Sequence, residues 1–258
     1  MAIYLKKFEN HTQYETYING SGAILPNVSI CTTEGDVHYN PYVPPTPVET
    51  RVVAKFNVTS TSSPTQLCYS SSINQFSTIE IDGVAQPSVV DEYTFSTTGE
   101  HTVKYTLTDP TSIGGYAFYY CSGLTSIDIP SGVTSIGEQA FSDCNSLTSI
   151  AISDSVTTIG NSAFYNCYNL TSCTIGTGVT SISDNMFVDC YALTSIVIPN
   201  NVTSIGYGAF WGCSNLTSVT IGSGVSEIGN CAFYDCGSLD AASIAAIEAI
   251  DPNAFYCD

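Results

Sequence analysis

The stretch "AFWGCSNLTSVTIGSGVSEIGNCAFYDC", residues 209–236, contains two Ala-Phe pairs, each followed by a cysteine three residues after the phenylalanine. The same spacing recurs upstream at a constant step of 23 residues. The phenylalanines are Phe118, Phe141, Phe164, Phe187, Phe210 and Phe233, and the cysteines are Cys121, Cys144, Cys167, Cys190, Cys213 and Cys236. A period between about 20 and 50 residues predicts a solenoid.

One repeat unit is too small to fold alone. Its few large apolar side chains contribute about 2 kcal/mol each on burial, whereas ordering the backbone costs about 1–2 kcal/mol per residue. We therefore expect turns that stack and bury one another, so that the array folds as a unit. Between Leu147 and Cys167, the residues Leu147, Ile150 and Ile152 fit an inward-facing strand. Ala163-Phe164 fits a short helical or 3₁₀ corner.

The repeat "LTSIxIPxxVTSIGxxAFxxC" resembles the leucine-rich repeats of the bacterial BspA or Treponema type from about Ser112 to Cys236. The resemblance implies a curved right-handed solenoid over residues 111–258, with one face of strands and one of short helical or irregular segments. Members of that family are mostly non-enzymatic surface proteins that bind proteins, matrix or neighbouring cells. After Leu239 the strand pattern gives way to "DAASIAAIEAI", which predicts a capping helix at about 239–250.

Two further regions precede the repeats. Residues 1–47 are polar and irregular and run into a proline-rich linker, and they resemble the beginnings of proteins encoded by gut Bacteroidetes phages. Residues 48–110 contain short alternating runs and the hairpin dipeptide Asp82-Gly83, which predict a small β-sandwich. Its closing "TTGEHTVKYTL" resembles the last strand of immunoglobulin-like modules. The expected fold class is thus a β-rich solenoid preceded by an Ig-like sandwich.

The charge distribution restricts the partners. The net charge is −18, from 23 acidic and five basic residues, and no basic residue follows Lys104. Residues 111–258 carry 12 acidic residues and no base, a net charge of −12. Such a surface repels nucleic acid and anionic membranes. We expect no membrane insertion, because no segment has about 20 apolar residues, and the opening residues show no signal-peptide pattern.

The recurring cysteines allow three interpretations. Zinc sites need grouped ligands, usually with histidine, and the repeats have one cysteine per turn and no histidine. Disulfides between neighbouring turns are geometrically possible, but equivalent side chains point in parallel, so one pair would leave its neighbours unpaired. We favour a ladder of reduced thiols that fill space inside the coil, with Cys173 in an inward strand position.

No enzymatic site is expected. His11, His38 and His101 precede the repeats and have no carboxylate or cysteine at catalytic spacing. Asp143, Asp189 and Asp235 recur before the repeated cysteine and allow a calcium row, but solvated turn residues are the simpler interpretation. We therefore expect no catalytic residue, no metal and no cofactor.

Positions that vary among the repeats are those that the coil does not dictate. Two aromatic rows adjoin the repeated Phe-x-x-Cys and suit a surface for protein or glycan contacts, although the simpler interpretation is that these rings only cover the outer corners of neighbouring coils. The candidates in these rows are Tyr165, Tyr168, Tyr191, Trp211 and Tyr234. A second variable row on the strand face, the usual binding surface of a solenoid, contains Asp128, Thr174 and Thr220.

The sequence thus predicts a non-enzymatic recognition or adhesion protein that binds protein or glycan on a cell surface or in a virion. The phage resemblance favours a fibre or decoration component anchored through residues 1–47, a segment that can also serve oligomerisation. A bacterial surface adhesin is the alternative, and a glycan-active enzyme is a third hypothesis.

Overall fold

The computed structural model describes residues 32–33, 36–37 and 50–257, so most of the attachment segment and linker predicted at residues 1–47 lies outside the described residues. The chain divides into two compact units, Met1–Val48 and Glu49–Asp258. The first contains an antiparallel pair, β1 (Thr32–Thr33) and β2 (Asp36–Val37). All other elements belong to the second unit.

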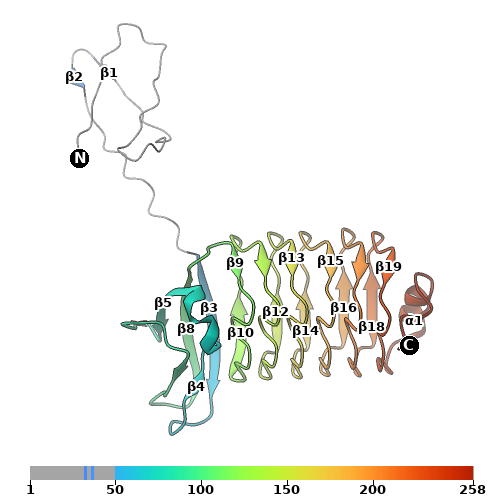
Figure 1. The fold of residues 1–258 in the computed structure, drawn as a ribbon, viewed down its shortest axis with the longest axis horizontal. Coiled ribbons are helices and arrows are strands. Elements are labelled where there is room, and N and C mark those ends of the chain that lie inside the picture. Colours follow the sequence, from blue (N-terminus) through green and yellow to red (C-terminus); the bar gives the residue numbers. More distant parts are fainter. Residues whose placement is uncertain (1–31, 34–35, 38–49, 258) are drawn as a thin grey trace. The chain divides into compact units, whose positions relative to one another are not determined.

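An antiparallel sheet forms the N-terminal end of the second unit (Figure 1). Its order is β10-β3-β8-β5-β6, with β3 (Arg51–Val58), β5 (Phe76–Ile81), β6 (Val84–Ala85), β8 (Gly99–Leu107) and β10 (Leu124–Asp128). Buried and exposed residues alternate along β3, as a strand with one covered face requires. A second pair, β4 (Thr65–Gln66) with β7 (Glu92–Tyr93), and the 3₁₀ helix η1 (Ser70–Gln75) complete this end.

The Asp82-Gly83 dipeptide forms the tight turn between β5 and β6, with both residues at positive φ, 49° and 81°. The Ig-like identity of this region stays a prediction. The predicted boundary at 110/111 falls inside one compact unit, because β10, which belongs to the first solenoid turn, pairs along β3.

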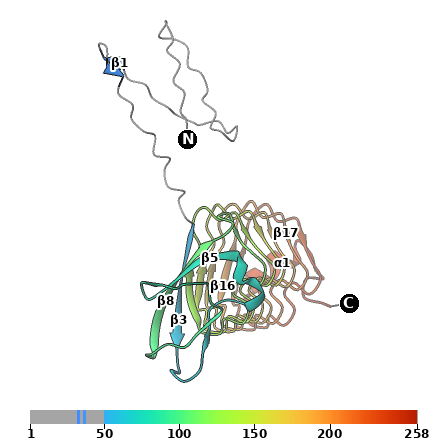
Figure 2. The same ribbon diagram turned by 60° about the vertical axis from the view of Figure 1, so that its left-hand side comes forward.

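The repeats wind into stacked coils, which Figure 2 shows obliquely. Each turn adds a pair of strands. One row contains the strands β12 (Ser149–Ala151), β14 (Ser172–Thr174), β16 (Ser195–Ile198) and β18 (Ser218–Ile221). The other contains β9 (Ser112–Ile113), β11 (Ser135–Ile136), β13 (Thr158–Ile159), β15 (Ser181–Ile182), β17 (Ser204–Ile205) and β19 (Glu227–Ile228). Pairing is parallel and joins residues one repeat apart, such as Ile150 with Cys173. The 23-residue solenoid is therefore confirmed.

The interior is a column of identical side chains. The six repeated phenylalanines are fully buried, and consecutive rings stack with centroids 5.1–5.5 Å apart and planes within 11° of parallel. At the N-terminal end Tyr105 of β8 packs edge-on against Phe118, with centroids 5.2 Å apart, so the core of the sheet continues into the core of the coils.

The corners correct one expectation. They are successive turns closed by bonds such as Cys144 N–H to the Phe141 carbonyl, and no helix is assigned to any corner in the described coils. The reason is that the residues two before and two after each repeated phenylalanine have left-handed φ, for example Asp143 at 60° and Asn166 at 58°. A right-handed helix cannot continue through such residues.

Both ends of the coil are covered. The N-terminal end pairs with β3, and the C-terminal end is covered by the helix α1 (Ala241–Glu248), which falls inside the predicted 239–250. Asp240 caps this helix by accepting from Ser243 N–H at 2.7 Å. The Ser243 hydroxyl in turn accepts from Val219 N–H of β18 at 2.9 Å, so the helix satisfies a backbone donor on the last long strand.

Candidate functional site

The described repeated cysteines line the interior of the coil. All six are buried and reduced, and each thiol from Cys144 onward donates to the carbonyl of the phenylalanine of the preceding turn at 3.1–3.3 Å. Burial raises the pKa of Cys236 and of Cys173 to about 12 and raises that of Cys167 further. Thiols held in this protonated form are poor nucleophiles and poor metal ligands.

One cysteine pair departs from this row. Cys231 and Cys257 form a disulfide with their Cα atoms 5.0 Å apart. Cys231 N–H also donates to the Tyr256 carbonyl and Phe233 N–H to the Ala254 carbonyl, both at 2.9 Å. The end of the described chain therefore stacks on the last complete turn as a partial coil. The repeat spacing does not predict this pair, because both cysteines lie outside the repeated Phe-x-x-Cys position.

The aromatic candidates gather on the outside of the corners. Tyr168 and Tyr191, one repeat apart, stack with centroids 5.3 Å apart and planes at 5°, and both are exposed. Trp211 lies edge-on to Tyr234, with centroids 5.2 Å apart. Partial desolvation by neighbouring atoms, followed by the charges of Asp143 and Asp189, raises the pKa of Tyr168.

Tyr165 is separated from the Trp211 pair. The equivalent position in the intervening turn holds Val188, which is buried. On the N-terminal side the equivalent position holds Ser142, and beside it Tyr119, Tyr120 and Tyr165 line a hollow of about 230 Å³. Tyr119 and Tyr120 were not among the predicted site residues, although Tyr120 stands where other turns have Asp, Asn or Gly.

The acidic row at this corner has a conformational origin. Asp143, Asn166, Asp189, Gly212 and Asp235 occupy the left-handed position two residues after each phenylalanine, and Asn, Asp and Gly are the residues that adopt it most readily. Among the residues that the structure describes, no group of three or more His, Cys, Asp or Glu lies close enough to hold a metal ion.

The strand-face candidates lie on a different part of the coil. The strands β10, β14 and β18 expose Asp128, Thr174 and Thr220, respectively. Val197 of β16 belongs to the same row and is 62% exposed. Asp128 lies opposite Val53 in the β10–β3 pairing, so the sheet borders this end of the row.

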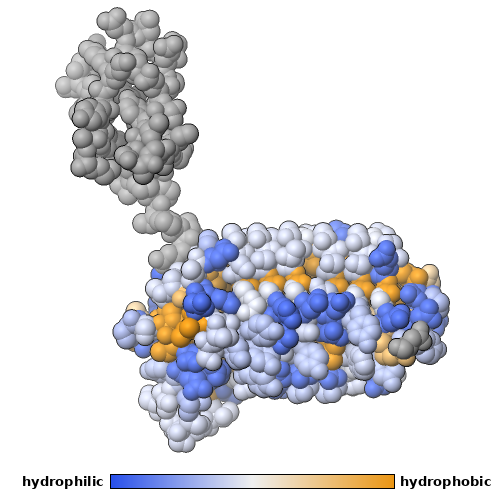
Figure 3. All heavy atoms as spheres, in the orientation of Figure 1, coloured by the Kyte–Doolittle hydropathy of each residue, from blue (hydrophilic) through white to orange (hydrophobic). Residues whose placement is uncertain are grey.

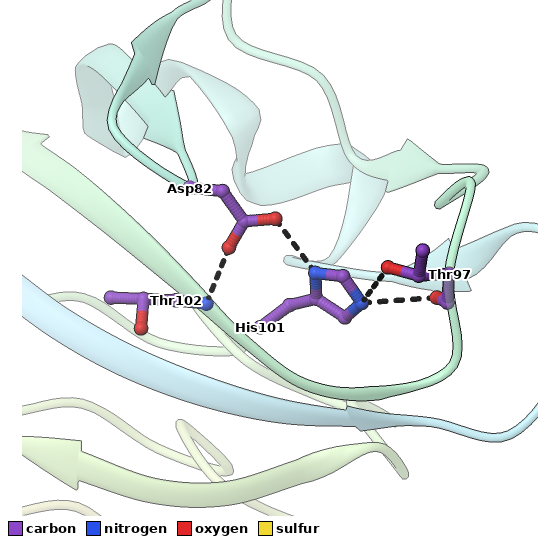
Figure 4. Close-up of polar contacts among 4 residues, drawn as sticks. All are labelled: Asp82, Thr97, His101 and Thr102. Carbon is purple, nitrogen blue, oxygen red and sulfur yellow. Dashed lines mark hydrogen bonds and ion pairs between the residues drawn. The ribbon is translucent and has the colours of Figure 1, made fainter.

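The fold brings together one polar group that the sequence spacing did not predict (Figure 4). His101 Nδ1 lies 2.7 Å from Asp82 Oδ2, and His101 Nε2 lies 3.4 Å from the Thr97 hydroxyl. The order of groups resembles that of a hydrolase triad. However, the atom nearest to Nε2 is the Thr97 carbonyl oxygen, at 3.0 Å, which has no proton to give, and the hydroxyl is farther away. The group is structural, and it anchors the β5–β6 turn through Thr102 N–H to Asp82 at 2.9 Å.

The face of the molecule drawn in Figure 3 is mostly polar. On the face shown in Figure 3, hydrophobic residues surface as a narrow stripe along the coils and as a patch over the sheet at the N-terminal end. None of the helices in the described part of the chain is long and apolar enough to cross a membrane.

Comparisons with known proteins agree with the coil geometry. The family model described as "BspA type Leucine rich repeat region" matches residues 88–203 and 180–258 in six copies. No curated protein sequence matches the chain significantly.

Solved structures with similarity come from several bacteria. A leucine-rich repeat protein of T. pallidum is 24% identical with a TM-score of 0.45, over 55% of this chain and 77% of that one. A leucine rich cell surface protein of Faecalibacterium prausnitzii is 22% identical with a TM-score of 0.39, over 59% and 62% of the two chains. The pneumococcal vaccine antigen PcpA is 18% identical with a TM-score of 0.34, over 53% and 56%.

Proposed function

Because the chain belongs to the BspA-type leucine-rich repeat family, we propose that it is a non-enzymatic recognition protein that presents the outer corners of its coils to a protein or glycan partner. The observation that carries the proposal is the difference in sequence variation between the inward-facing and the outward-facing positions of the repeat. Inward positions repeat nearly without change, whereas the outer corner varies and gathers rings such as the stacked Tyr168 and Tyr191.

The exposed rings suit contact with a partner. Aromatic side chains contribute much of the energy of interfaces, because they bury large area at little cost in side-chain entropy. On the outer corner these rings stand next to carboxylates and amides that can donate or accept hydrogen bonds, among them Asp189 and Asn166. The same combination of a flat ring and polar neighbours fits a sugar ring as well as a peptide.

The interior supports a role without catalysis. The buried thiols are held protonated, and the atom nearest to Nε2 of His101 is a carbonyl oxygen, which has no proton to give. A glycan hydrolase would need a pair of carboxylates across a cleft, and this remains the weakest of the three hypotheses.

A screen of protein and glycan arrays with the full chain tests the proposal. We expect a hit whose affinity falls with Trp211→Ala and survives Thr220→Lys, with the circular dichroism of both variants unchanged. Loss with Thr220→Lys alone would move the function to the strand face. Turnover of a polysaccharide by the chain would contradict the proposal.

Two places of display are compatible with this function. The phage resemblance of residues 1–47 supports a virion fibre or decoration component anchored through that segment, and family membership supports a bacterial surface adhesin. Immunogold localisation of the native protein on virions or on cell envelopes distinguishes them.

A further inference from the structure

The hollow beside Ser142 is an exception in a regular surface. The position after the repeated phenylalanine holds an aromatic ring or valine in every other complete turn, namely Tyr119, Tyr165, Val188, Trp211 and Tyr234. The small Ser142 leaves a gap between the first and third turns, and the walls of this gap include Tyr119, Tyr120, Tyr165, Asp143 and Asn166. Adjacent coils are about 5.4–5.5 Å apart here, as measured between phenylalanine rings.

The wall contains a carboxylate that forms no ion pair with any residue that the structure describes. Asp143 is 8% exposed, and its two oxygens accept from Asn166 Nδ2 and from the Ser142 hydroxyl, both at 2.9 Å. A carboxylate can accept about four hydrogen bonds, so capacity remains. Acidic side chains buried to this degree are usually paired with a cation, yet the sequence has no lysine or arginine after Lys104.

The rings around this carboxylate attract positive charge. The rings of Tyr119 and Tyr120 lie edge-to-face with centroids 4.5 Å apart, so the pair presents both a face and an edge. A lysine or arginine head within about 6 Å of a tyrosine face is attracted by the ring quadrupole. The net charge of −12 over residues 111–258 also raises the local concentration of cations.

We propose that this hollow binds a lysine or arginine side chain of a partner protein, with Asp143 as the charge partner and Tyr119, Tyr120 and Tyr165 as the surrounding rings. The inference rests on the proposed recognition function and specifies the chemistry of one contact. A neutral sugar could also stack on these rings, but it would leave the Asp143 charge uncompensated.

The test is calorimetric titration of the full chain with a tetralysine amide and a tetraarginine amide, with maltotetraose as the neutral probe. We expect one peptide to bind per chain, and Asp143→Asn to weaken it about tenfold or more, a factor that corresponds to about 1.4 kcal/mol. Asn is tolerated at this left-handed position, because Asn166 occupies the equivalent place in the next turn.

Two further variants separate a site from general attraction. Ser142→Tyr places in the gap the ring that other turns carry, and we expect it to abolish binding with the fold intact. Asp235→Asn removes the same charge from the same coil position away from the hollow, and we expect it to change the affinity less than twofold.

Three results would overturn the proposal. They are equal weakening by Asp143→Asn and Asp235→Asn, binding of maltotetraose but not of the peptides at the hollow, and no binding of any probe. If none of the probes bound while an array partner remained sensitive to Trp211→Ala, the cation site would be wrong and the recognition function would stand.

Discussion

Gly160 is the position at which the close stacking of the coils can be tested most directly. A Cβ added there would lie 2.3 Å from the backbone nitrogen of Glu138 and 2.6 Å from the carbonyl carbon of Gly137, one turn earlier. Ordinary van der Waals contact begins at 3.4 Å, so the two backbones would have to separate by 1.1 Å, the difference between 3.4 and 2.3 Å. The clash is with backbone and cannot be relieved by a rotamer change.

The cost follows from what that separation breaks. Gly160 N–H donates to the Ile136 carbonyl at 2.8 Å, and β11 and β13 pair immediately before this residue. Overpacking costs about 1–3 kcal/mol, and a lost backbone hydrogen bond about 1 kcal/mol. We therefore expect Gly160→Ala to lower the free energy of unfolding by about 2–4 kcal/mol, and the melting temperature by about 4–16 °C for a unit of this size.

Gly237→Ala is the matched control. Nothing lies within 4 Å of a Cβ at Gly237 and its φ is not in the left-handed region, while the equivalent position holds Asn145, Tyr168 and Tyr191 in other turns. This variant should gain up to about 1 kcal/mol, because alanine restricts the unfolded chain. Urea unfolding followed by circular dichroism measures both. Equal stability of the two variants would refute the stacking argument.

Three further predictions concern other parts of the chain. Cys257→Ser should lower the free energy of unfolding by about 3 kcal/mol, since the disulfide to Cys231 closes a loop spanning 26 residues; dithiothreitol should destabilise the wild type and leave the variant unchanged. The six repeated thiols should resist iodoacetamide at about pH 8 in the native protein and react fully in denaturant, because burial raises their pKa; mass spectrometry of each peptide would show native alkylation if the thiols were accessible. For Asp82, burial raises the pKa, but the hydrogen bonds from His101 and Thr102 N–H lower it by more, to a net value below 3.8. The Asp82 carboxylate therefore stabilises the fold above about pH 3.8, and this stabilisation is lost as the pH falls through its lower pKa in the folded chain. Asp82→Asn should flatten the decline of the urea midpoint below about pH 4. An unchanged acid profile would contradict this.

The repeat period was sufficient to predict the coil, because a side chain that recurs every 23 residues can be buried by its own copies. Phe164 illustrates this, since it stacks between the rings of Phe141 and Phe187. The corners were harder, because an apolar Ala-Phe pair is compatible with a helix and only backbone angles distinguish the two. The recurring Asp, Asn and Gly before the cysteine are the signal in the sequence for left-handed backbone, but the same residues also fit solvated turns or a calcium row.

Contacts between distant segments could not be predicted from spacing. Asp82 and His101 are 19 residues apart in sequence and come together only because β5 and β8 pair. The pairing of β10 with β3 likewise joins the first coil to a strand that lies about 70 residues earlier in the sequence. Alternation predicts strands, but it does not indicate which strand lies at the edge that a following solenoid can extend.

A periodic coil creates rows, and a row offers the same contact at every step, so it cannot by itself define a single site. Specific features must therefore arise where the chain departs from its own repeat. Ser142 stands where most other turns have an aromatic ring, and its small side chain opens a hollow. Cys231 occupies the left-handed position two residues before Phe233 and forms a disulfide there. After Leu239, a helix takes the place of a strand and ends the array. Since stacking dictates the inward residues and tolerates almost any outward one, exceptions in the outer row cost the fold little. On this reasoning we propose that the partner's cationic side chain contacts the chain near Ser142, at the break in the aromatic row.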